Sequence, residues 1–92
     1  MGLRLGRHNF TQVVYDSASD VLYASLPGAE TARRETTPEE DVWMFDHRDH
    51  FVGIRVLEPR RRIDRDGALW VSLPSGELER AAGVEAALRS VA

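Results

Sequence analysis

Residues 42–57 constrain the fold of this chain more than any other stretch, because they combine two apolar, β-prone runs with a short polar turn. The apolar side chains alternate between two faces over residues 42–45 and again over residues 51–57. A period of two is typical of strands, and the Asp-rich residues 46–50 between the runs are typical of a turn. The pattern therefore predicts an antiparallel hairpin at the centre of the fold.

Three more strands are predicted around this hairpin. Residues 10–15 and 21–26 are rich in β-branched and aromatic residues, and the Asp and Ser residues between them favour a turn. Residues 69–73 also alternate, and we expect the preceding Asp66-Gly67 pair to form a tight hairpin turn. These patterns therefore predict a chain that folds mainly as a series of β-hairpins.

The remaining segments are predicted to be less regular. Residues 1–9 contain two glycines and show no period, so we expect a loose lead-in. The polar residues 29–41 favour one helical turn at most, whereas residues 75–91 place apolar side chains near one face at helical spacing and predict a helix. Together these patterns predict a single α+β domain over residues 1–92. It would be a mainly antiparallel sheet of five or six strands with a C-terminal helix.

Composition excludes several kinds of chemistry. The chain has no cysteine, which excludes disulfides and thiol catalysis, and all 12 of its basic residues are arginine, which excludes lysine Schiff bases. A net charge of −3 disfavours general binding to nucleic acid, because neutralising phosphates requires a basic surface. No apolar run approaches the roughly 20 residues of a membrane span, and the first residues do not resemble a signal peptide. We therefore expect a cytoplasmic protein without a membrane partner.

One group of residues has the composition of a metal site. The central turn contains four residues of metal-ligand type within five positions: Asp46, His47, Asp49 and His50. Zinc needs three or four converging ligands, whereas a hairpin turn splays its side chains. We expect a solvated turn and no cofactor, with a metal-dependent enzyme as the alternative. No other pattern points to a catalytic residue, so the sequence favours a protein that is not an enzyme.

A second group is basic. Arg60, Arg61 and Arg62 are consecutive and follow strand-forming aromatic residues, which makes them a possible anion patch. Binding of nucleic acid through these arginines is a further alternative, although the negative net charge and the lack of a recognised motif argue against it.

The aromatic residues suggest an interface. The alternation predicts that five of them share the sheet face opposite Leu22, Met44, Ile54 and Val71; these five are Tyr23, Trp43, Phe45, Phe51 and Trp70. One helix covers one face of a sheet, so the second face would expose large aromatic side chains unless the sheet closes into a barrel or a partner packs against it. We expect a homodimer through this face.

Two parts of the chain also resemble a known family. Tyr-Asp-Ser-Ala-Ser-Asp-Val-Leu-Tyr at residues 15–23, together with the two strands of the central hairpin, resembles the YuzE-like family of bacterial domains of unknown function. The resemblance covers about residues 13–58, and Arg55 stands where that family usually has an acid. The resemblance implies a compact antiparallel β domain with no established reaction.

The favoured function is therefore a non-catalytic interaction or assembly module that acts through an aromatic sheet face. Its expected partners are a second copy of the chain and a protein that the sequence does not identify.

Overall fold

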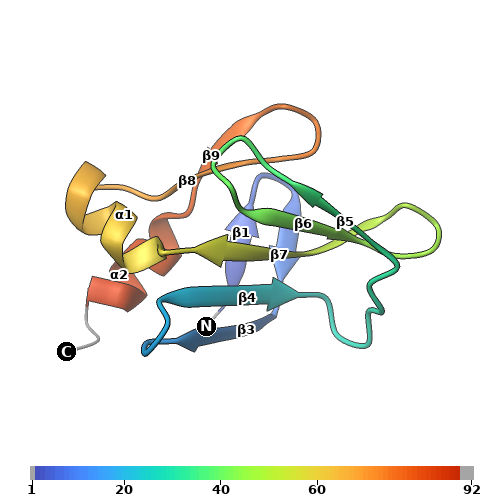
Figure 1. The fold of residues 1–92 in the computed structure, drawn as a ribbon, viewed down its shortest axis with the longest axis horizontal. Coiled ribbons are helices and arrows are strands. Elements are labelled where there is room, and N and C mark those ends of the chain that lie inside the picture. Colours follow the sequence, from blue (N-terminus) through green and yellow to red (C-terminus); the bar gives the residue numbers. More distant parts are fainter. Residues whose placement is uncertain (1, 90–92) are drawn as a thin grey trace.

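The computed structural model describes residues 2–89 (Figure 1). In chain order the elements are β1 (Leu3–Leu5), β2 (His8–Phe10), β3 (Gln12–Asp16), β4 (Val21–Ser25), β5 (Arg33–Thr36), β6 (Val42–Phe45), β7 (Phe51–Leu57), α1 (Pro59–Asp66), β8 (Trp70–Ser72), β9 (Leu78–Arg80) and α2 (Ala82–Arg89). Five strands form one antiparallel sheet in the order β3-β4-β7-β6-β5, and β1-β2 and β8-β9 form two small sheets. The predicted α+β class, with a mainly antiparallel sheet and a C-terminal helix, is confirmed. Within the described residues, neither helix has the length and apolar character needed to cross a bilayer.

The central hairpin is also confirmed. Strands β6 and β7 pair antiparallel, with Trp43 opposite Ile54, and the turn closes through a hydrogen bond from the Asp46 N–H to the His50 carbonyl at 3.0 Å. The register shifts between Met44 and Phe45, which indicates a β-bulge. This irregularity changes which side chains of the two strands face each other.

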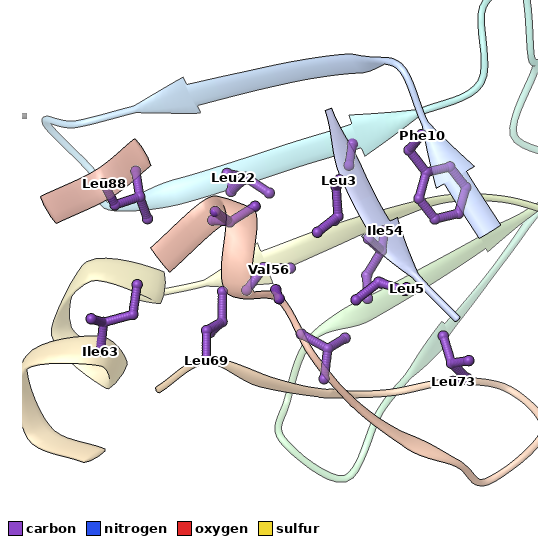
Figure 2. Close-up of a cluster of buried hydrophobic side chains, with 14 residues drawn as sticks. Leu3, Leu5, Phe10, Leu22, Ile54, Val56, Ile63, Leu69, Leu73 and Leu88 are labelled. Atoms are coloured by element: carbon purple, nitrogen blue, oxygen red, sulfur yellow. The ribbon is translucent and has the colours of Figure 1, made fainter. Parts of the chain in front are cut away.

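The hydrophobic core lies on one face of the five-stranded sheet (Figure 2). The sheet contributes side chains from β4 and β7, and both helices and both small hairpins supply the opposing layer. The fully or almost fully buried members are Leu3, Leu5, Phe10, Leu22, Ala24, Ile54, Val56, Ile63, Leu69, Val71, Leu73, Ala81, Val84 and Leu88. This packing uses one face of the sheet and leaves the other to the surface.

The prediction of a loose N-terminus over residues 1–9 is wrong. Strands β1 and β2 form a hairpin with Leu3 opposite Phe10, and their side chains lie over the sheet beside Ile54 (Figure 2). Leu3, Leu5 and Phe10 are each at most 1% exposed. The alternation of Leu3 and Leu5 before Gly6, which adopts a left-handed φ of 59°, was the signal for this hairpin.

The predicted hairpin turn at Asp66-Gly67 is replaced by a helix. Helix α1 begins with Pro59 at its first position and ends at Gly67, whose N–H donates to the Ile63 carbonyl at 2.8 Å. The Asp20 carboxylate accepts the N–H groups of Arg60 and Arg61, both at 3.1 Å, and therefore caps the helix from a distant turn. Ile63 is the one apolar residue of the helix with its side chain in the core cluster, which explains why helical periodicity was not visible in the sequence.

The predicted C-terminal helix over residues 75–91 starts later than expected. A turn with Gly76 at φ 95° leads into strand β9, and helix α2 begins only at Ala82. Positions 90 and 91 of the prediction lie outside the described residues. The Gly76 conformation reverses the chain, so residues 78–80 pair with β8 instead of joining the helix.

Glu85 ties helix α2 to both parts of the β8-β9 unit. Its side chain is buried, accepts the Leu69 N–H at 2.8 Å and forms hydrogen bonds with the Arg80 guanidinium at 2.9 Å. The bond to Arg80 is the main cause that lowers the pKa of Glu85 below its usual value, with the Leu69 N–H acting in the same direction. The carboxylate is therefore the form that the folded state prefers.

This lowered pKa predicts an acid-sensitive contribution to stability. Below about pH 4.5, the ordinary pKa of glutamate, the unfolded chain takes up a proton at this position more readily than the folded protein does. The free energy of unfolding should therefore fall as the pH decreases through the folded-state pKa. In urea titrations over a pH series, Glu85→Gln should show a shallower fall than the wild type. The exposed-site control Glu30→Gln should follow the wild type, and identical pH profiles for all three proteins would contradict the assignment.

Candidate binding surface

One face of the five-stranded sheet points away from the core, and we call it the open face. Its two central cross-strand rows are Val14, Tyr23, Arg55, Val42, Thr36 and, beside them, Gln12, Ser25, Gly53, Met44, Arg34. No member of the buried cluster in residues 2–89 belongs to these rows. Val14 and Tyr23 are 64% and 44% exposed, so two large side chains with apolar surface face the solvent here.

Arg55 lies at the centre of the open face on the middle strand, β7. It is flanked in register by Tyr23 on one side and Val42 on the other. Its Nε atom is buried and has no hydrogen-bond partner in the described part of the chain, and its guanidinium forms no ion pair there. A buried donor without an acceptor is destabilising by about 1–3 kcal/mol, and more for a charged group. No group of residues 2–89 accepts a hydrogen bond from this Nε atom, so it is free to bond an acceptor on a partner.

The row beside Arg55 is shaped by Gly53. A Cβ atom at this position would lie 2.8 Å from the Ala24 carbonyl oxygen and 2.9 Å from the Met44 Cε atom. The absent side chain therefore leaves room for Met44 to lie across β7. Methionine is flexible and polarisable, which suits a surface that adapts to a partner. Arg34, next to Met44 on the edge strand, is exposed and also pairs with no carboxylate of residues 2–89.

The predicted aromatic stripe is wrong, because its five residues do not share a face. Trp43 lies opposite Ile54 on the core side and donates its indole N–H to the Ser72 carbonyl at 2.8 Å. The bulge at residues 44 and 45 brings Phe45 opposite Phe51. Both rings then join the core side, where Phe45 is 5% exposed and the Phe51 ring lies 5.1 Å from the Phe10 ring.

The other two members of the stripe are exposed but lie on different sheets. Tyr23 is on the open face, whereas Trp70 is on β8 in a small sheet. The predicted dimer interface through Tyr23, Trp43, Phe45, Phe51 and Trp70 therefore loses its geometric basis. Period-two reasoning within single strands did not detect the irregularity that places Phe51 on the core side, and it could not relate the faces of different strands.

The turn at residues 46–50 is held by its own hydrogen bonds. The Asp46 carboxylate accepts the N–H groups of Arg48 at 2.8 Å and His50 at 2.9 Å, and these bonds with the backbone lower its pKa. Asp49 accepts a hydrogen bond from the Arg33 Nε atom at 3.1 Å, and the neighbouring His47 is exposed. No group of three or more His, Cys, Asp or Glu side chains in residues 2–89 is arranged to hold a metal ion. The geometry therefore offers no support for the alternative of a metal-dependent enzyme at this turn.

The three consecutive arginines do not form one patch. Helix α1 directs them to different sides: the Arg62 side chain is 11% exposed and bonds Asp41, whereas that of Arg61 is 72% exposed and lies 3.6 Å from Glu58. The Arg60 Nε atom lies 3.9 Å from the Asp64 carboxylate. The anion patch predicted for Arg60, Arg61 and Arg62 is therefore corrected: a helix separates successive side chains by about 100°.

Arg62 belongs instead to a buried clamp with Asp41. One Asp41 oxygen accepts bonds from Arg62 Nη1 at 2.8 Å and from the Leu57 N–H at 2.9 Å. Arg62 also donates to the carbonyl groups of Leu57 at 3.1 Å and Trp70 at 2.8 Å. Glu39 extends the clamp by accepting the N–H of Ser72 at 2.9 Å and its hydroxyl at 2.7 Å. These bonds join the β5–β6 turn to β7, α1 and β8.

A polar cavity of about 370 Å³ adjoins this clamp, with Glu39, Arg62 and Trp70 among its lining residues. Burial raises the pKa of Asp41, while the Leu57 N–H and Arg62 oppose that rise. The second Asp41 oxygen is buried without a hydrogen-bond partner in the described residues, which agrees with the direction of the pKa. The hydrogen bonds of the clamp join separate segments of the fold, so we assign the clamp a structural role.

Sequence reasoning missed Arg55 as a functional candidate. The sequence did contain a signal: Arg55 lies between the apolar residues Ile54 and Val56 in a strongly β-prone run. An arginine there must emerge on the face opposite these two residues, but only the paired strands show that no acid lies beside it.

Comparison with protein-family models, with curated proteins and with solved structures gave no match for this chain. The resemblance of residues 13–58 to the YuzE-like family therefore stays a prediction from the sequence.

Proposed function

We propose that this protein is a non-catalytic interaction module of the cytoplasm that binds a partner protein across the open face. The observation that carries the proposal is the combination of exposed Tyr23 and Val14 with the unpaired guanidinium of Arg55 in one row of an uncovered sheet. Tyrosine and arginine are the residue types that contribute most to binding energy in protein interfaces.

The chemistry of the open face indicates what the partner supplies. An apolar surface with an unsatisfied arginine at its centre fits a segment that carries an Asp or Glu side chain among apolar residues. A carboxylate would accept the hydrogen bonds of Arg55, and Arg34 would add a second positive charge near the edge. The ten positions of the two open-face rows carry no acid, and Asp16 at the neighbouring end of β3 already accepts the Ala18 N–H at 3.1 Å.

Two other occupants fit this surface less well. A second copy stacked squarely on the open face would bring two Arg55 guanidinium groups toward each other, and like charges oppose association. Nucleic acid would supply anions, but a single aromatic ring, Tyr23, provides little stacking surface and the chain has a net charge of −3. An acidic protein segment is therefore the occupant that charge and apolar surface both favour.

A comparison of three tagged proteins tests this function. Wild type, Arg55→Glu and the control Arg4→Glu would be purified from nuclease-treated extracts of the cells that produce the protein, and bound proteins quantified by mass spectrometry. Breaking a buried charge pair at an interface costs about 2 kcal/mol or more, so Arg55→Glu should reduce one specific partner by about 30-fold or more. Arg4 is exposed on β1, away from the sheet rows of the open face, so Arg4→Glu should retain that partner.

The partner's binding segment then provides the second readout. Peptides covering the captured protein should bind through a segment with at least one essential Asp or Glu, and binding should weaken with salt. Equal retention by Arg55→Glu and wild type would contradict the use of the open face. A segment whose acids can all be replaced without loss would contradict the carboxylate contact.

A further inference from the structure

The two edges of the five-stranded sheet differ in how they are protected. Edge strand β5 exposes every residue and carries Arg33, Arg34 and Glu35, and charged side chains are a common means of preventing strands from pairing with other chains. Edge strand β3 has the sequence Gln-Val-Val-Tyr-Asp, without proline, glycine or an internal charge. In Figure 1, β3 lies at the margin of the molecule with no element beyond it. The β3 edge is therefore open to another strand.

We propose that β3 pairs antiparallel with β3 of a second copy, so that two five-stranded sheets become one continuous ten-stranded sheet. The two copies would be related by a two-fold axis perpendicular to the sheet and passing beside Val14. This inference goes beyond the proposed function and does not depend on it, because it uses the backbone edge of β3 and does not use Arg55, although the Val14 side chain belongs to both surfaces.

The geometry of antiparallel pairing selects one register. Directly opposed residues must point to the same face, so a two-fold axis must place a residue opposite its own equivalent. Centring on Val14 is the arrangement that pairs all five residues of β3. Centring on Val13 would leave Tyr15 and Asp16 without a β3 partner, and centring on Tyr15 would do the same to Gln12 and Val13.

The side chains are complementary in this register. Gln12 lies opposite Asp16 of the second copy, twice by symmetry, so an amide donor meets a carboxylate that has further acceptor capacity. Val14 lies opposite its equivalent on the open face, and its 64% exposed side chain would gain an apolar neighbour. Val13 lies opposite Tyr15 on the core side, where both are already packed against the buried cluster.

The pairing has a consequence for the open face. A two-fold axis perpendicular to the sheet leaves both open faces on the same side, with the two Tyr23 side chains flanking a central pair of Val14 residues. Five residues per copy form a small interface, so the dimer should be weak. The fraction of protein in the dimer should therefore rise with the protein concentration.

Charge substitutions at the two-fold axis test the pairing and its register together. Sedimentation velocity over a wide concentration range should show wild type shifting from 10.3 kDa toward twice that mass. Val14→Lys and Val14→Glu should each remain monomeric, because like charges would face each other across the axis. An equimolar mixture of the two variants should dimerise, since opposite charges then meet. Because Val14 is exposed, the substitutions should leave the circular dichroism spectrum unchanged.

Four further variants check the strand and the edge. Gln12→Arg should strengthen the dimer by placing a guanidinium opposite Asp16, whereas Arg34→Glu on the β5 edge should leave the dimer unchanged. Val14→Cys introduces the only thiol of the chain and should yield a disulfide-linked dimer with oxidised glutathione, whereas Ser17→Cys in the adjacent turn should not. This measurement decides the register even if a charged variant fails to fold. A wild type that stays monomeric up to millimolar concentration would overturn the proposal, as would a mixture of Val14→Lys and Val14→Glu that does not associate.

Discussion

Replacing Arg62 by alanine should lower the free energy of unfolding by about 3–5 kcal/mol, the cost of leaving a buried charge without its partner. Asp41 is 0% exposed and accepts the Arg62 bond at 2.8 Å, and the same guanidinium holds two backbone carbonyl groups. A domain of this size has a total stability of about 5–15 kcal/mol, so the variant should retain only part of its folded population under mild denaturant. Urea titration followed by tryptophan fluorescence measures the loss.

The control for this prediction lies on the same helix. The Arg61 side chain is 72% exposed, and Arg61→Ala should change stability by less than about 0.5 kcal/mol. The decrease in the free energy of unfolding caused by Arg62→Ala should also be smaller at pH 4 than at pH 7. Burial already raises the pKa of Asp41, and without Arg62 that carboxyl takes up a proton more readily. Equal losses in the two variants would show that the clamp does not support the fold.

Phe10→Ala should cost about 3–5 kcal/mol of stability, the usual effect of truncating a buried phenylalanine. The side chain is 1% exposed, and its ring contacts the Phe51 ring edge to face at 5.1 Å. The substitution would therefore leave a cavity between the N-terminal hairpin and the sheet. Urea unfolding gives the loss, and hydrogen exchange should show faster exchange first in β1 and β2.

An exposed residue of another hairpin serves as the control. Leu78 is 55% exposed on β9, so Leu78→Ala should cost less than about 1 kcal/mol. A loss in Phe10→Ala as small as in this control would contradict the burial of the Phe10 ring between the N-terminal hairpin and the sheet.

The two proposed contacts reinforce each other if both hold. Pairing through β3 would present two Arg55 side chains on one side of a continuous sheet, and a partner with two acidic segments could engage both. Such a bivalent contact raises the apparent affinity without any new type of interaction. Val14 belongs to both contacts, whereas Arg55 lies on β7 and not on the β3 edge, so Arg55→Glu separates them by weakening the partner contact while leaving the β3 pairing unchanged.

Local features of the sequence determined the strands of the central hairpin and the general class of the fold. The alternation of apolar residues over residues 51–57 and the hydrogen bonds of Asp46 within its turn involve residues only a few positions apart. Such patterns can therefore be recognised in the sequence alone. The signals at Leu3, Leu5 and Pro59 were also present, but short strands and a helix with one core residue give too few apolar positions to establish a period.

Only the tertiary structure decided how these elements combine. The Asp41–Arg62 clamp joins residues 21 positions apart, and Asp20 caps a helix that begins about 40 positions later. Trp43 and Phe45 proved to lie on the same side as Ile54, and the register shift after Met44 places Phe51 there as well, which removed the predicted aromatic stripe. Arg55 became a candidate only when the neighbouring strands proved to carry no acid beside it. Strand pairing and burial depend on contacts between distant segments, and a pattern within a single strand does not contain that information.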